Sequence, residues 1–216
     1  PHSYAARGAA DNRRADRRVA MSGREEVVAR LREGCAASGF DLAMPLQIGW
    51  YNDGVDGSLR LDDFGSSGHL AVVVGNTRAL WPVWRAALGS DPGLAASDNP
   101  LDEYTVRAID DVVSTLGVRA SVRFAHETGP RRVAMQRLAH AAGLAYLTET
   151  HLSVHPTYGP WIALRAVVSV AHPGPPGPAP VLAHPCGSCA RGCLRTFQRA
   201  ISTTAGAPPN EASLRA

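Results

Sequence analysis

Three cysteines lie close together in the segment HPCGSCARGCLR, where Cys186, Cys189 and Cys193 follow the spacing C-x₂-C-x₃-C. A short turn containing Gly lets thiolates converge on one metal, so this spacing is compatible with zinc or with an iron–sulfur cluster. His184 or the distant Cys35 could supply a fourth ligand. Three unligated thiols in a surface turn are the alternative, because a fourth Cys at cluster spacing is missing.

A second group of chemically capable side chains lies in HLSVHPTYGPWIALRAVVSV, residues 151–170. The polar and aromatic residues around its Tyr-Gly-Pro turn are His151, His155, Trp161 and Arg165. A structural turn needs Gly and Pro, but it does not need two His, a Trp and an Arg beside an apolar strand. We therefore expect one wall of a ligand-binding cavity here. An internal salt bridge from Arg165 to an acid such as Glu149 is the structural alternative.

His140 lies in the segment LAHAAG, among small apolar residues of a predicted helix. A histidine in that setting is either a hydrogen-bonded core residue or a ligand, and the segment alone leaves both interpretations open. The acidic residues Asp102, Glu103, Asp110 and Asp111 lie on a helix that looks amphipathic, which is typical of a solvated face.

Hydrophobic patterning predicts the elements that must position these groups. The predicted helices span residues 22–39, 78–88, 98–117 and 131–143. The predicted strands span residues 46–51, 69–75, 118–124 and 161–170, with a polar loop at 52–68. Ser22 and Glu25 form a capping box at the first helix, whose apolar face includes Cys35. Helices and strands are mixed without a strict βαβ order, which indicates a single α/β (α+β) domain with a mixed sheet flanked by helices.

Composition divides the rest of the chain into flanking segments. We expect a disordered Arg-rich extension at 1–21, the domain at 22–170, a Pro/Gly linker at 171–185, a Cys-containing segment at 186–203 and a frayed tail at 204–216. Because Met21 precedes a helix start, we interpret it as a natural start of translation.

The overall composition argues against several classes of protein. The formal net charge is +3, and the 22 basic residues, all Arg, are scattered, so we expect no nucleic-acid partner. Apolar runs are strand-sized, so we expect no membrane span. The cysteine pattern is unlike a secreted disulfide framework and favours a reducing cytoplasm. Nucleotide-binding GxGxxG and Walker motifs, GxSxG and HExxH are all missing.

Five stretches together resemble a known family. MPLQIGWYN, HLAVVVGNTRALWPVWRAAL, DNPLDEY, RRVAMQRLAHAAGLAYL and HPTYGPWIALRAVV fall in the order and spacing seen in the cobalamin-processing proteins of the cblC class, the methylmalonic aciduria and homocystinuria type C family. The resemblance covers about residues 24–200. It implies a flavin-nitroreductase-like α/β fold whose cavity binds cobalamin (vitamin B12) in the base-off form.

The resemblance also implies roles for individual residues. By position, the family's contacts to bound cobalamin fall on Val133, Ala134, Met135, Gln136, Leu147, Thr148, Glu149, Ser153 and Leu164. His140 matches the family's helix histidine beside the corrin, and His155 and Trp161 match its His-Pro and Trp positions. Arg165 matches an arginine that helps to bind the carboxylates of glutathione. His140 and Arg165 are therefore the candidate catalytic residues.

The activity implied is removal of the upper axial ligand of cyanocobalamin or alkylcobalamins, with reduced flavin such as FMN or a small thiol as partner, in a monomer or homodimer. Two alternatives stay open. One is a corrinoid carrier that turns nothing over. The other is a small iron–sulfur redox protein, because the cysteine element also resembles the cluster motif of epoxyqueuosine reductases, whose C-x₂-C-x₂-C-x₃-C-P spacing is not reproduced here.

Overall fold

Runs of Val, Leu and Ala form the centre of an antiparallel sheet in the computed structural model, which describes residues 23–187, 189–190 and 192–204. The strands lie in the order β1 (Leu42–Gln47), β2 (His69–Asn76), β6 (Ala163–Pro173) and β3 (Ala120–Phe124). β2 and the middle of β6 are buried. Such continuous apolar runs are typical of strands that are covered on both faces.

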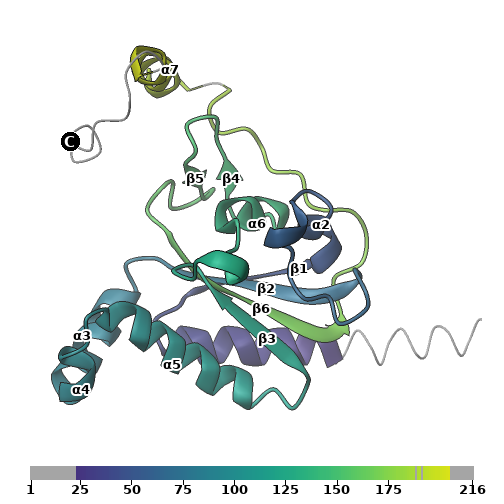
Figure 1. The fold of residues 1–216 in the computed structure, drawn as a ribbon, viewed down its shortest axis with the longest axis vertical. Coiled ribbons are helices and arrows are strands. Elements are labelled where there is room, and N and C mark those ends of the chain that lie inside the picture. The colour runs from purple at the N-terminus through teal and green to yellow at the C-terminus, as the bar shows by residue number, and fades with distance from the viewer. Residues whose placement is uncertain (1–22, 188, 191, 205–216) are drawn as a thin grey trace, which may run out of the picture.

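Helices cover both faces of this sheet (Figure 1). The N-terminal helix, residues 23–37, and α5 (Pro100–Ser114) pack on one face, while α2 (Ile48–Asn52) and α6 (Met135–Ala141) pack on the other. Successive strand residues point to opposite faces, so Val168 joins the first core and Val167 the second. The predicted α/β architecture, a sheet flanked by helices, is confirmed. The expectation of a mixed sheet was wrong, because all three strand pairs of this sheet are antiparallel.

The periodic segments were predicted well. Cys35 is buried in the first core as expected, and the predicted apolar stripes of the N-terminal helix and of α5 face that same core. Strand β3 lies within the strand predicted at 118–124, and its alternate residues Val122 and Phe124 are turned toward the first core. The capping box at Ser22, the extension at 1–21 and the tail beyond Thr204 lie outside the described residues.

The prediction of a strand at 46–51 was wrong. Strand β1 ends at Gln47 and the chain turns into α2, where Ile48 and Tyr51 are both buried. The turn is fixed by close backbone contacts, because the N–H of Gly49 donates to the carbonyl of Ser67 at 2.8 Å. Pro45 is tolerated in β1 because that strand is at the edge of the sheet, where a missing N–H disrupts no ladder.

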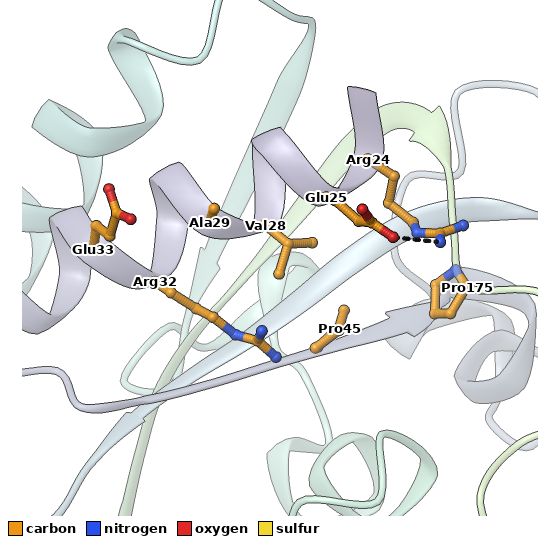
Figure 2. A pocket seen from close by; sticks show the side chains of 8 residues that line it. All are labelled: Arg24, Glu25, Val28, Ala29, Arg32, Glu33, Pro45 and Pro175. Carbon is orange, nitrogen blue, oxygen red and sulfur yellow. Dashed lines mark ion pairs between the residues drawn. The ribbon is translucent and has the colours of Figure 1, made fainter. Parts of the chain in front are cut away.

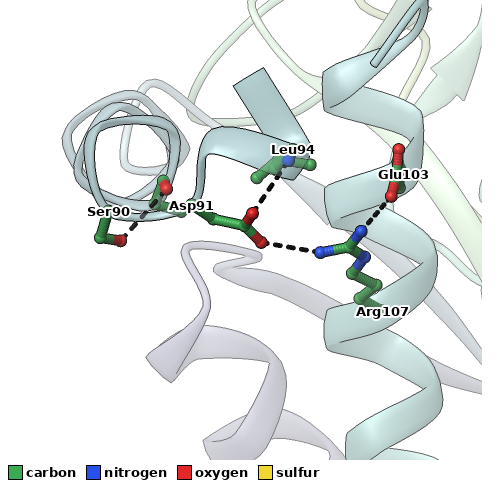
Figure 3. A network of polar contacts seen from close by, with 6 residues as sticks. Ser90, Asp91, Leu94, Glu103 and Arg107 are labelled. Atoms are coloured by element: carbon green, nitrogen blue, oxygen red, sulfur yellow. Dashed lines mark hydrogen bonds and ion pairs between the residues drawn. The ribbon is translucent and has the colours of Figure 1, made fainter. Parts of the chain in front are cut away.

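A polar network joins α5 to the end of α3 (Leu80–Ser90) and to α4 (Pro92–Ala95) (Figure 3). The helix α4 was not predicted from the sequence. Asp91 caps α4 by accepting from the N–H of Leu94 at 3.0 Å, and it pairs with Arg107 at 2.8 Å. The Leu94 N–H and the Arg107 guanidinium lower the pKa of the Asp91 carboxyl. Arg107 also pairs with Glu103 on its own helix. Pro92 favours a helix start at this point.

Five further elements complete the described chain. They are η1 (Gly57–Leu59), η2 (Gly129–Arg131), β4 (Tyr146–Leu147), β5 (Ser153–Val154) and α7 (Cys193–Thr204). β4 and β5 form a separate two-stranded sheet, and α7 lies beyond it, at the top of Figure 1. The predicted linker at 171–185 begins later than expected, because β6 continues to Pro173. None of the described helices has both the length and the apolar character that crossing a membrane requires.

Candidate functional site

A cleft of about 470 Å³ lies between the start of α6 and the β4 region. Its lining comprises Ala125, Val133, Ala134, Met135, Gln136, Arg137, Leu147, Thr148 and His151. Six of the residues that the family resemblance assigned to cobalamin contact are among them, although they come from two separate segments of the chain. The apolar walls are interrupted by a few amide and hydroxyl groups, as in many small-molecule sites.

Tyr51 does not line the cleft but holds one of its lining residues, Ala134, in place. Its side chain is buried, and its hydroxyl accepts from the N–H of Ala134 at 3.0 Å and donates to the carbonyl of Leu59 at 3.0 Å. The Ala134 N–H lies at the start of α6, where backbone donors lack helical partners. Burial raises the pKa of the Tyr51 phenol, so the hydroxyl keeps its proton at neutral pH. The sequence signal for this role was only the aromatic residue within QIGWYN.

Replacing Tyr51 by Phe is expected to lower the free energy of unfolding by about 1–3 kcal/mol, because the Ala134 N–H and the Leu59 carbonyl both lose a partner. Urea unfolding measures this loss. The matched control is Tyr104→Phe, which removes one hydroxyl bond to the Ser38 carbonyl, far from the cleft in the chain. Equal effects of the two substitutions on stability and on corrinoid affinity would contradict the role of Tyr51 in the cleft.

The far side of the cleft is held by the loop that follows β4. The Gln136 amide donates to the carbonyl of His151 at 2.5 Å. The Thr148 hydroxyl accepts from the N–H of Leu152 at 3.2 Å and lies 2.9 Å from the hydroxyl of Thr150. His151 has a positive φ of 59°, a strained conformation for a residue with a side chain. The loop is therefore closed on itself and tied to α6.

His140 does not line the cleft. Its Nδ1 accepts from the N–H of Leu147 at 3.1 Å, so it joins the end of α6 to β4. Its ring packs edge-on against Tyr146, which packs in the same way against His184. His184 in turn lies 2.9 Å from a carboxylate oxygen of Glu149. The pKa of the Glu149 carboxyl is lowered, first by a hydrogen bond from its own backbone N–H and second by the contact with His184. The ring contacts from His140 through Tyr146 to His184 therefore connect the end of α6 to the segment that precedes the cysteines.

The remaining residues assigned by the resemblance do not line the cleft. Ser153 pairs with Leu147 across the small sheet, and its buried hydroxyl oxygen has no hydrogen-bond partner among the described residues. Leu164 packs against the core beneath α6. His155 has a structural task, since its Nδ1 accepts from the N–H groups of Thr157 and Tyr158, and burial lowers its pKa. Trp161 is 83% exposed and forms no part of the cleft lining.

Arg165 also lies away from the cleft. It is the extra residue of a β-bulge, because Val74 pairs with Ala166 while Gly75 pairs with Leu164. A bulge re-aims side chains, and here the guanidinium faces a different pocket, on the side of α3 and α5. The salt bridge to Glu149 considered as an alternative is not formed, because Arg165 donates from Nε to the Asn76 amide oxygen at 2.7 Å.

The cysteine segment contributes no metal centre within the described residues. Cys186 is half-buried and Cys189 and Cys193 are exposed, and no group of three His, Cys, Asp or Glu side chains in the described chain is arranged to hold a metal ion. Cys35, considered as a fourth ligand, is buried in the core, and this burial raises its pKa to about 11. Metal binding by the three clustered cysteines stays a prediction.

A groove of the same volume, about 470 Å³, lies between the N-terminal helix and β1 (Figure 2). Its cations already have partners. Arg24 donates to the carbonyl of Gly174 at 3.3 Å and lies 4.0 Å from Glu25, while Arg32 donates to the carbonyl of Ala43 at 3.2 Å. The Arg32 contact covers part of the open edge of the sheet at β1, and the Arg24 contact ties the helix to the residue after β6, so both contacts have a structural task.

Comparisons with known proteins place the fold. No protein-family model and no curated protein sequence matches the chain. A solved structure of a Caenorhabditis elegans B12-trafficking protein CblC, a human MMACHC homologue, matches with a TM-score of 0.61 at 18% identity, covering 85% of this chain and 82% of that chain. An epoxyqueuosine reductase matches with a TM-score of 0.50 at 14% identity, over 82% of this chain and 52% of the other. The predicted CblC-like α/β fold is thereby confirmed.

Proposed function

We propose that this protein binds cobalamin in the cleft between α6 and β4 and removes its upper axial ligand. The observation that carries the proposal is the convergence of six residues, assigned by sequence resemblance alone, on one cleft: Val133, Ala134, Met135, Gln136, Leu147 and Thr148. The likeness of the fold to a B12-trafficking protein supports the same ligand class. Cobalamin is the substrate in this proposal, not a resident cofactor.

The donor set of the cleft fits a corrinoid. A corrin ring carries a broad apolar body with amide side chains, and the cleft pairs apolar Val133 and Met135 with the exposed amide of Gln136. The unpartnered buried hydroxyl of Ser153 adds a donor beside β4, where an unmade hydrogen bond is costly. The corrinoid supplies the redox chemistry, with electrons from a reduced flavin or a thiol.

The chain's own residues bind, orient and exclude water. Val133 and Met135 are buried and form the apolar wall that keeps water from the bound face of the ligand. We assign His140 a positioning role, because its Nδ1 accepts from the Leu147 N–H. That bond leaves the proton of a neutral His140 ring on Nε2 and fixes how β4 meets α6.

Titration of the purified protein with cyanocobalamin tests the proposal directly. We expect a saturable change in the visible spectrum, followed by loss of cyanide when a reduced flavin or a thiol is added anaerobically. A spectrum identical to that of free cobalamin at high protein concentration would exclude the corrinoid site. Saturable binding without turnover, with either reductant, would favour the corrinoid carrier.

A further inference from the structure

A second pocket, of about 240 Å³, lies on the other side of the sheet from the cleft, between the start of α3 and α5. It is lined by residues of three kinds: cationic Arg78 and Arg165, aromatic Trp81 and Trp84, and small polar or apolar groups that include Asn76 and Leu101. Of its lining residues, only Arg165 was expected from the sequence to contact a ligand. The pocket shares no lining residue with the cleft.

The charge of Arg165 is poorly compensated in this pocket. Among the described residues its hydrogen-bond acceptor is the neutral amide oxygen of Asn76, at 2.7 Å. Asn76 is itself buried and has its amide nitrogen committed to the Thr77 carbonyl at 2.8 Å, so it is rigidly held. Burial lowers the pKa of Arg165 and the more distant charge of Asp102 partly opposes this. A half-buried guanidinium without a carboxylate partner favours binding of an anion.

Two tryptophans define the rest of the pocket. The indole Nε1 of Trp84 is buried and has no acceptor within the described part of the chain. A buried donor of this kind normally has a partner. Trp81 lies beside it with ring centroids 5.4 Å apart, and is 58% exposed, so much of its surface is open to a ligand. An aromatic ring packs well against such a surface.

We infer that this pocket binds a small aromatic carboxylate, whose carboxylate meets Arg165 and the Trp84 N–H while its ring packs against Trp81. The volume suits a ligand below the usual range of drug-sized sites. A carboxylate can accept two hydrogen bonds from the Arg165 guanidinium and one more from the Trp84 N–H. The aromatic ring of the ligand covers the indole surface of Trp81, which a ligand without a ring would leave exposed to water. This inference does not depend on the corrinoid function, because the two sites share no residue.

Benzoate is the probe, with calorimetric titration of the whole protein as the measurement. We expect a dissociation constant on the order of 1 mM or lower for benzoate. Acetate, which keeps the carboxylate but lacks the ring, and benzamide, which keeps the ring but lacks the charge, should each bind at least about tenfold more weakly. Arg165→Gln should weaken benzoate by about one to two orders of magnitude, the range expected for a charged hydrogen bond.

Trp84→Phe is the second variant, because it keeps the aromatic bulk and removes only the N–H. We expect it to weaken benzoate about two- to tenfold. Gln136→Trp, placed in the cleft, should leave benzoate binding unchanged, so failure of the corrinoid site is distinguished from failure of this one. No heat of binding for benzoate, equal binding of benzoate and acetate, or tighter binding of glutathione than of benzoate would each overturn the inference. The last result would assign the pocket to a thiol co-substrate instead.

Discussion

Replacing Gln136 by Trp is expected to lower the affinity for cyanocobalamin at least about tenfold, which corresponds to about 1.4 kcal/mol of binding free energy. Gln136 is exposed on α6 and lines the cleft, so a larger side chain occupies ligand space without entering the core. Its amide contact to the His151 carbonyl is also lost, which loosens the far wall of the cleft. The shift in the midpoint of the spectral titration measures the effect.

The matched control is Ala86→Trp, an exposed position on α3 that lines none of the pockets described above. It adds the same or more bulk to a helix surface, and we expect unchanged affinity for cyanocobalamin. Both variants should unfold within about 0.5 kcal/mol of the parent protein, as is usual for surface substitutions. Unchanged corrinoid affinity in Gln136→Trp would show that the ligand binds elsewhere.

Periodicity accounts for the part of the fold that could be predicted from sequence. The apolar stripe of α5 and the alternation in β3 each repeat over several residues, so each pattern averages out local exceptions. Elements of two to four residues, and a helix of little more than one turn such as α2, offer no such repeat. β4, β5 and α4 were therefore missed, and α2 was taken for a strand because Leu46, Ile48 and Tyr51 are apolar in either conformation.

The candidate site divides in the same way. Six of the cleft residues could be named from the sequence because each occupies a position in a motif that resembles the family. That the start of α6 and β4 lie side by side is a result of the tertiary fold. The direction of the Arg165 side chain could not be predicted from the strand pattern. Arg165 is itself the extra, unpaired residue of the bulge between Leu164 and Ala166, and a bulge changes the direction of a side chain. Likewise, only the folded chain shows that His140 accepts from the Leu147 N–H.

That bulge depends on a glycine, and Gly75→Ala is expected to lower the free energy of unfolding by about 3 kcal/mol, the upper part of the range for overpacked cores. A Cβ atom at Gly75 would lie 2.5 Å from the carbonyl oxygen of Ala163, closer than such atoms approach in folded proteins. The clashing atom belongs to the backbone of the paired strand, so no side-chain rotation relieves it. Strands β2 and β6 must separate at the point where the register shifts.

Gly89→Ala supplies the comparison, since it is the same substitution in α3, where an added Cβ meets nothing within 4 Å. Alanine is favoured over glycine in a helix by about 1 kcal/mol, so this variant should be as stable as the parent or slightly more stable. Urea unfolding of both variants measures the contrast. Because the separation of β2 from β6 displaces Arg165, Gly75→Ala should also weaken benzoate binding in the fraction that stays folded. If Gly75→Ala is as stable as the parent protein, the bulge can move along the strand with no loss of stability. The claim that the bulge fixes the direction of the Arg165 side chain would then be wrong.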